Sequence, residues 1–149
     1  MTRIKLKKAT IKDELLIYNW FNNKENISYK IKTKKKISLR EHTIWIKNFF
    51  KEKLGSIWII NFHNKAIGNI RLSYIKNKNY EVDIFVDKHY RGLNLASASL
   101  QKVEEKLEIG TIIFSYIKKN NLKSMNFFIK NNYLLFKTTK NIWFLKKSI

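Results

Sequence analysis

The middle of the chain restricts the fold most, because three strand-like runs follow one another there and lead into a helix. Residues 56–62 are apolar and rich in isoleucine, residues 67–75 alternate apolar and polar side chains, and residues 80–86 form the third run. Short polar turns between them predict neighbouring antiparallel strands. After Gly92 the apolar spacing becomes helical as far as Leu107. We therefore expect an antiparallel sheet that feeds directly into a helix.

The remaining segments complete a mixed sheet flanked by helices. Thr10 with Asp13, and Ser38 with Glu41, place a hydroxyl and an acid three residues apart, which is typical of a helix start. The elements expected outside the centre are a strand at 3–8, a helix from about 10, a loop at 30–36, a second helix from 38, a strand at 111–117, a helix at 122–131 and strands at 133–138 and 142–145. No repeat or linker is visible, so we expect a single domain over residues 1–149, of the α/β class.

The composition excludes several kinds of site. The 149 residues include no cysteine, which rules out disulfides, thiolate metal ligands and a cysteine nucleophile. The three histidines lie far apart, and no metal site is expected. The start of the chain does not resemble a secretory signal and no long apolar run follows, so we expect a cytoplasmic protein without a membrane segment. The formal net charge of +20 favours ligands that carry phosphates.

A candidate anion site lies where the third central strand ends. Residues 86–96 run from a strand, through a tight turn that contains Gly92, into a helix that begins with small residues. Uncapped backbone N–H groups at such a helix start, together with the helix dipole and the cation of Arg91, suit a pyrophosphate. The glycine also has a structural explanation, since a tight turn needs its conformational freedom.

This segment resembles the acetyl-CoA signature of the GNAT superfamily of N-acetyltransferases. Arg91 and Ala96 match the first and last positions of that signature, and Asn94 replaces its central glycine. Asparagine is the residue besides glycine that best tolerates a left-handed backbone. Residues 81–87 resemble the fourth strand of the family, and residues 121–124 resemble its Asn-x-x-Ser motif. The resemblance covers essentially the whole chain and implies a GNAT-like fold, with a mostly antiparallel sheet of about seven strands and helices on both faces.

The resemblance also implies an activity and a cofactor site. The activity is the transfer of an acetyl group from acetyl-CoA to a primary amine. The residues implied to bind acetyl-CoA are Ile84, Phe85, Val86, Arg91, Gly92, Leu93, Asn94, Leu95, Ala96, Asn121, Ser124 and Phe128. For Asn121, capping of the following helix is the alternative role.

The implied catalytic groups handle two protons. Glu81 would be the general base, directly or through water, and Asp83 on the same side of the strand is the alternative base. Many members of the family protonate the departing thiolate with a tyrosine at the position of Phe128, and phenylalanine cannot donate a proton. The sources left open for this proton are Ser124, Tyr116, Tyr133 and water, and the remaining alternative is a poor or inactive catalyst.

The N-terminal half resembles enzymes of one branch of the superfamily. Trp20 with Asn22, and Glu41-His42 with Trp45, are similar to phrases in GNAT enzymes that acetylate nucleotide-linked amino sugars in nonulosonic acid pathways. The implied substrate-binding residues are Trp20, Asn22, His42, Trp45 and Arg71. A basic run would suit the diphosphate of a uridine diphosphate sugar, and it consists of Lys30, Lys32, Lys34, Lys35, Lys36 and Arg40. For His42 and Trp45, burial in the core is the alternative, because both lie on the apolar stripe of their helix.

Two other functions are compatible with the composition. A protein N-terminus, such as that of a ribosomal protein, is the alternative acceptor, and an acidic peptide would fit the positive charge. A basic nucleic-acid-binding domain without catalysis is the other alternative, but no nucleic-acid-binding motif is visible. The expected partner is therefore a small-molecule amine, and a homodimer is left open.

Overall fold

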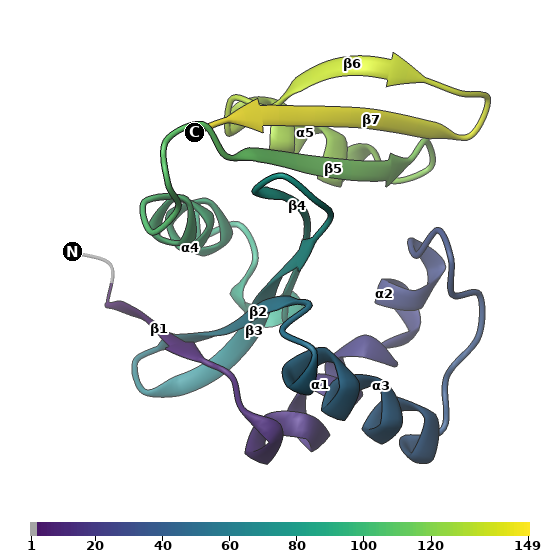
Figure 1. The fold of residues 1–149 in the computed structure, drawn as a ribbon, viewed down its shortest axis with the longest axis vertical. Coiled ribbons are helices and arrows are strands. Elements are labelled where there is room, and N and C mark those ends of the chain that lie inside the picture. The colour runs from purple at the N-terminus through teal and green to yellow at the C-terminus, as the bar shows by residue number, and fades with distance from the viewer. Residues whose placement is uncertain (1–2) are drawn as a thin grey trace.

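A seven-stranded sheet forms the centre of the protein in the computed structural model, which describes residues 3–149 (Figure 1). Its order is β1-β2-β3-β4-β5-β7-β6, and every neighbouring pair is antiparallel except β4 and β5. The strands are β1 (Ile4–Lys8), β2 (Gly55–Phe62), β3 (Lys65–Tyr74), β4 (Asn79–Val86), β5 (Ile112–Lys118), β6 (Leu134–Thr138) and β7 (Ile142–Ser148). The mixed, mostly antiparallel sheet predicted from the sequence is confirmed.

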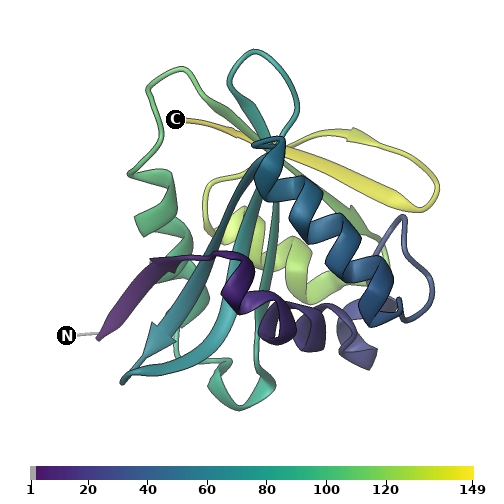
Figure 2. The ribbon, with the colours of Figure 1, turned by 60° about the horizontal axis from the view of Figure 1, so that its bottom comes forward.

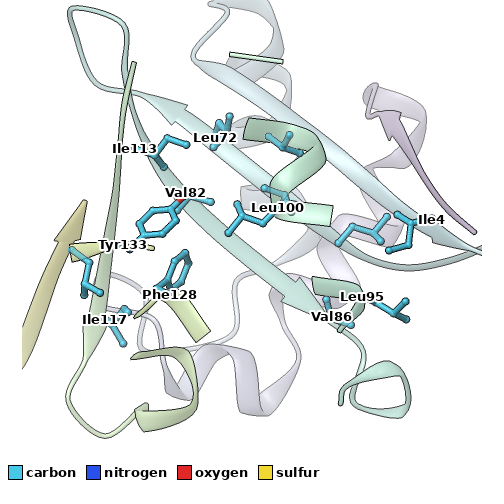
Figure 3. Close-up of a cluster of buried hydrophobic side chains, with 14 of the residues drawn as sticks. Ile4, Leu72, Val82, Val86, Leu95, Leu100, Ile113, Ile117, Phe128 and Tyr133 are labelled. Atoms are coloured by element: carbon cyan, nitrogen blue, oxygen red, sulfur yellow. The ribbon is translucent and has the colours of Figure 1, made fainter. Parts of the chain in front are cut away.

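Helices cover both faces of the sheet, as expected (Figures 1 and 2). They are α1 (Glu14–Phe21), α2 (Lys24–Ser28), α3 (Leu39–Lys51), α4 (Leu95–Glu104) and α5 (Leu122–Lys130). α1 and α3 pack on one face, in a cluster that contains Ile17, Phe49 and Phe85. α4 and α5 pack on the other face, in the larger cluster that contains Leu100 and Phe128 (Figure 3). None of the helices within residues 3–149 has the length and apolar character needed to cross a membrane.

The two predicted helix starts are built as the sequence indicates. The side chain of Thr10 accepts from the N–H of Lys12, and Asp13 closes a capping box around a 3-10 turn that precedes α1. The Ser38 hydroxyl accepts from the N–H of Glu41 at 3.1 Å, and Glu41 accepts in return from the N–H of Ser38. Both starts depend only on contacts three residues apart or closer, so the local sequence determines them.

The short helix α2 is absent from the sequence-based expectation. It has five residues, and its N-cap is Asn23, whose side chain accepts from the N–H of Asn26. A helix this short has little intrinsic stability and shows no apolar period, so its packing determines whether it forms. Only Ile27 of α2 is buried. α4 also ends earlier than expected, at Glu104 rather than Leu107.

The site is positioned by the one parallel strand pair. β4 and β5 are paired only from Asn79 with Ile112 to Glu81 with Phe114. Beyond that point β4 continues to Val86 bonded only to β3, while β5 continues to Lys118 bonded only to β7. The two strands therefore separate in a V, whose narrow end lies at Glu81 and Phe114.

Candidate active site

The main cavity of the described residues occupies the V between β4 and β5. Its volume is about 490 Å³. Residues 82–86 of β4 and 115–117 of β5 form its two sides, and α2, the start of α4 and α5 complete the wall. The unpaired edges of both strands thus face an open space in which an extended ligand can meet backbone N–H and C=O groups.

The start of α4 presents backbone N–H groups to this cavity. Gly92 has a φ of 78° and Asn94 a φ of 60°, so both are left-handed, as predicted for the position that Asn94 occupies. The Asn94 side chain makes no capping hydrogen bond. The first-turn N–H groups of Leu95, Ala96 and Ser97, all of which line the cavity, have no acceptor within the helix. Together with the helix dipole they form a site suited to a phosphate.

Cationic side chains surround the same end of the cavity. The Arg91 Nε donates to the carbonyl oxygen of Val86 at 2.9 Å, which anchors the guanidinium at the end of β4. Its Nη1 lies 2.6 Å from Oε1 of Glu25 on α2. Lys123 and Lys130 of α5 also line the cavity. The end of the cavity beside α4 and α5 therefore holds three cationic side chains and one carboxylate, that of Glu25.

Asp83 lies on the α1–α3 side of β4 and is neutralised by two cations. Lys30 donates to its carboxylate, and Nη2 of Arg71 lies 3.3 Å from the same oxygen. Burial disfavours the ionised carboxylate, but Lys30, Arg71 and the N–H of Ile84 outweigh it and hold the pKa of Asp83 at about 2. A second hollow of about 20 Å³, enough for one water, adjoins this group.

Glu81 and Tyr116 lie on the two sides of the V near its narrow end. Glu81 is half-buried, faces the same side of the sheet as Asp83 and is not in ion-pair contact with any described residue. Tyr116 lies two residues beyond Phe114, the strand partner of Glu81, and lines the cavity. Burial and then the negative charge of Glu81 raise the pKa of Tyr116, so the phenol keeps its proton at neutral pH.

Comparison with known families identifies the architecture. The family model described as acetyltransferase (GNAT) domain matches residues 3–133. The chain belongs to the GNAT acetyltransferase family. It is accordingly an acetyl-CoA-dependent N-acetyltransferase. No curated protein matches the sequence.

Several solved GNAT structures share the fold. RimL, the ribosomal L7/L12 alpha-N-protein acetyltransferase solved with coenzyme A, is 15% identical with a TM-score of 0.83, over 100% of this chain and 96% of that one. The spermidine N-acetyltransferase of Vibrio cholerae, solved with coenzyme A and spermine, is 14% identical with a TM-score of 0.82, over 98% and 95%. The Campylobacter jejuni N-acetyltransferase PseH is 16% identical with a TM-score of 0.72, over 97% of each chain. At these sequence identities the similarity shows a shared fold and nothing about the acceptor.

The cavity fits acetyl-CoA, the cosubstrate of GNAT enzymes. Its phosphate end offers the N–H groups of α4 and the cations described above, and its narrow end lies beside Glu81 and Tyr116. All residues predicted to hold acetyl-CoA line this cavity except Leu93, whose side chain is 55% exposed. Asn121 accepts from the N–H of Ser124 at 3.2 Å, which is the capping role given above as its alternative. Contact between these cavity-lining residues and acetyl-CoA stays a prediction.

The predicted catalytic residues divide into three near the V and one outside it. Asp83 and Ser124 line the cavity, and Glu81 lies at its narrow end. Tyr133 does not line it: the side chain is only 1% exposed, and its hydroxyl donates to Oε1 of Glu104 at 3.0 Å. Burial and Glu104 raise the pKa of Tyr133 well above its usual value. The placement of Tyr133 among the candidate proton donors is therefore corrected.

Three of the predicted acceptor-binding residues lie away from both cavities. Trp20 is buried against Phe85, with ring centroids 6.1 Å apart. Asn22 exchanges two hydrogen bonds of 3.0 Å with the backbone of Ile37 and so holds the loop before α3. His42 is fully buried, and neither ring nitrogen has a hydrogen-bond partner among residues 3–149. Trp20 thus packs on the sheet, Asn22 holds a loop, and His42 lies between α3 and the Tyr18 and Phe21 rings of α1, so that their contact with an acceptor stays a prediction.

The other predicted acceptor-binding residues reach the small hollow. Trp45 and Arg71 line it, and the Arg71 guanidinium lies 5.2 Å from the centroid of the Trp45 ring. Of the lysines between 30 and 36, only Lys30 lines a cavity, and Lys32, Lys34, Lys35 and Lys36 are exposed. Within residues 3–149 no group of three His, Asp or Glu side chains is placed to hold a metal ion.

Sequence reasoning missed the contribution of α2. Glu25, Asn26 and Tyr29 line the cavity from this helix and the residue after it. The available signal was Asn23, a residue type favoured at helix starts, directly after the apolar stretch of α1. Nothing in the local sequence shows that Glu25 would lie beside Arg91, 66 residues away.

Proposed function

We propose that this GNAT enzyme acetylates the primary amine of a nucleotide-linked amino sugar. The observation that carries the proposal is the positive charge around Glu81 on the α1–α3 side of the sheet. Lys30 and Arg71 lie on one side of the V, and Lys118 and Lys146 lie on strands at the other side. An amine attached to an anion is attracted to such a surface, whereas a polyamine is repelled.

The sequence phrases that resemble nucleotide-sugar acetyltransferases support the same acceptor, although Trp20, Asn22 and His42 lie in structural positions. The Campylobacter jejuni N-acetyltransferase PseH is among the structures that share the fold. An acidic protein N-terminus is the second candidate, favoured by the same positive charge and by the fold shared with RimL.

Glu81 is the proposed general base. Its carboxylate lies beside the narrow end of the V, is half-buried and has no described cation holding its charge. Asp83 is the weaker candidate, because a pKa of about 2 leaves it with little tendency to accept a proton. We assign to Asp83 the role of holding Lys30 and Arg71 in place.

Tyr116 is the proposed general acid. Acetyl-CoA supplies the acetyl thioester, and its sulfur needs a proton when the thioester is cleaved. Phe128 has no proton to give, and it packs edge to face against Tyr133 at a centroid distance of 4.9 Å. Tyr116 lines the opposite wall from β4 and keeps its proton at neutral pH. Arg91 and the first-turn N–H groups of α4 hold the diphosphate in this proposal.

A thiol-release assay with four acceptors tests the proposed substrate. They are a uridine diphosphate amino sugar, the same amino sugar without the nucleotide, an acidic N-terminal peptide and spermidine, each at equal concentration. We expect the highest kcat/KM for the nucleotide-linked sugar, with a loss of at least about ten-fold when the nucleotide is removed. A higher kcat/KM for the peptide would replace this acceptor with the second candidate.

A further inference from the structure

Four aromatic rings form an uncovered platform on the face of the sheet that carries Glu81. They are Phe114 and Tyr116 of β5, Phe136 of β6 and Phe144 of β7, and we call them the aromatic shelf. Each ring is next to two of the others, and the centroids of these neighbouring rings are 5.2 to 6.4 Å apart. None of the four belongs to either core cluster.

The shelf exists because helices cover only the other face of these strands. Ile113, Ser115 and Ile117 of β5 point toward α5 and are buried, so the residues between them point the opposite way. An irregularity in the pairing of β6 with β7 falls at Phe136. Such an irregularity redirects a side chain, and here Phe136 contacts both Phe114 and Phe144. Phe136 remains 44% exposed.

The shelf is continuous with the proposed catalytic site. Phe114 is the direct strand partner of Glu81 across the parallel pair. Tyr116 belongs to the shelf and also lines the main cavity. A ligand lying on the shelf therefore reaches Glu81 without crossing any other element.

Charge indicates what kind of ligand fits the shelf. The Lys137 Nζ lies 5.1 Å from the Phe144 ring centroid, and the Lys146 Nζ lies 5.1 Å from that of Phe136. A planar, uncharged ring system can stack on the aromatic rings while these two ammonium groups pair with an anionic group attached to it. A second copy of this chain is disfavoured, because each copy carries a net charge of +20 and would bring its own Lys137 and Lys146 to the contact.

We propose that the aromatic shelf binds the nucleoside diphosphate part of the acceptor, with the base stacked on Phe136 and Phe144 and the phosphates near Lys137 and Lys146. This inference rests on the proposed function and adds to it the place where the nucleotide is recognised. Four rings offer room for about one base, and each base that stacks on aromatic side chains gains appreciable affinity without hydrogen-bonded readout.

Isothermal titration with uridine diphosphate tests the shelf directly. Phe136→Leu and Phe144→Leu each remove a ring but keep an apolar side chain, and we expect both variants to fold, which their urea denaturation curves check. We expect each to raise the Kd for uridine diphosphate by at least about five-fold while the Kd for coenzyme A is unchanged. Tyr74→Leu removes an aromatic ring that is 50% exposed on β3, outside the shelf, and should leave both values unchanged.

A ligand that carries the phosphates but no base provides the second comparison. Inorganic pyrophosphate should bind more weakly than uridine diphosphate, and its Kd should not respond to Phe144→Leu. Equal affinity of the two ligands, or an unchanged Kd for uridine diphosphate in both leucine variants, would overturn the shelf proposal. If an oligouridine bound more tightly than uridine diphosphate and both leucine variants weakened its binding, the shelf would be a nucleic-acid site. If the protein formed a concentration-dependent dimer that Phe136→Leu abolished, the shelf would be a subunit interface. Either result would also overturn the proposal.

Steady-state kinetics separate this inference from the proposed function. With the nucleotide-linked sugar, Phe144→Leu should raise KM at least about five-fold and leave kcat nearly unchanged. If the sugar is a good substrate but its KM is unaffected by both leucine variants, the shelf proposal fails and the proposed function stands. If uridine diphosphate binds on the shelf but the linked sugar is not acetylated, the proposed function fails while the binding site stands.

Discussion

Two carboxylates on β4 show how strongly the environment of a residue determines its chemistry. Asp83 and Glu81 point to the same side of the strand, two residues apart. Asp83 is bonded to Lys30 and Arg71 and stays ionised down to a pH of about 2. Glu81 instead lies near the Tyr116 phenol, whose pKa it helps to raise. The carboxylate of Asp83 is thus held in ion pairs, whereas that of Glu81 has no ion-pair partner among the described residues, which is why Glu81 is the proposed base.

Replacing Glu81 tests the assignment of the base. Glu81→Gln keeps the shape of the side chain but removes its ability to accept a proton, so we expect kcat to fall by about 10²- to 10⁴-fold. The Kd for coenzyme A should change by less than about two-fold, because the group acts in the transition state. Glu105→Gln, on the exposed end of α4, is the matched control and should behave as wild type. A parallel loss of cofactor affinity would contradict the role of Glu81.

Replacing Tyr116 tests the assignment of the acid. Tyr116→Phe retains the ring on the shelf and removes only the hydroxyl, and we expect a fall in kcat of about 10²-fold or more in stopped-flow measurements of acetyl transfer. Ser124→Ala removes the hydroxyl of another cavity-lining residue that the sequence left open as the proton source, and should have a smaller effect. A larger fall in kcat for Ser124→Ala than for Tyr116→Phe would transfer the role of general acid to Ser124.

At the scale of elements, α2 connects the two walls of the V. Glu25 pairs with Arg91 at the end of β4, and the backbone of Ser28 accepts from Lys118 at the end of β5. Lys30, just after the helix, pairs with Asp83. A five-residue helix thus closes one side of the cavity through contacts with residues distant in the sequence.

The pair of Glu25 with Arg91 predicts a competition with the cofactor. Both side chains are partly exposed, and the Glu25 carboxylate lies on the guanidinium that is proposed to bind the diphosphate. Glu25→Gln should therefore lower the Kd for coenzyme A, by up to about five-fold at low salt, in a titration calorimeter. Glu52→Gln, at the end of α3, has no such partner among residues 3–149 and serves as control. A weaker affinity in Glu25→Gln would show that the pair organises the site rather than competing for it.

At the scale of the whole molecule, a buried polar group joins α4 to the C-terminal strands. The Glu104 carboxylate, 7% exposed, accepts from the Tyr133 hydroxyl and lies 2.6 Å from the Lys147 Nζ. The Tyr133 ring packs in turn on Phe128 of α5, which lines the cavity. Figure 3 shows the Phe128 and Tyr133 side chains next to each other in the core beneath these helices.

Tyr133→Phe separates stability from catalysis. Loss of one buried hydrogen bond to a charged acceptor should lower the free energy of unfolding by about 1 to 3 kcal/mol, measured by urea denaturation. The kcat should stay close to wild type, because the hydroxyl lies outside the cavity. Tyr74→Phe, with a half-exposed side chain, should change neither quantity. A large fall in kcat at unchanged stability would return Tyr133 to the list of proton donors.

The sequence by itself determined the features that depend on near neighbours. The capping boxes of Thr10 and Ser38, the alternation of β3 and the left-handed turn at Asn94 need only contacts within a few residues. Backbone sterics and hydrogen bonding act over that range, so the pattern of residues predicts them. The resemblance to the family added the prediction of a cofactor site, most of whose residues follow one another from the end of β4 to the start of α4.

Only the tertiary structure decided which distant side chains share a space. Lys30 with Asp83, Glu25 with Arg91, and Tyr133 with Glu104 are separated by 29 to 66 residues in the sequence. In the sequence, Tyr116 and Tyr133 look equally suitable as donors of the proton that the thiolate needs. Their surroundings differ because the separation of β4 and β5 opens a cavity beside Tyr116, while the packing of α4 and α5 buries Tyr133.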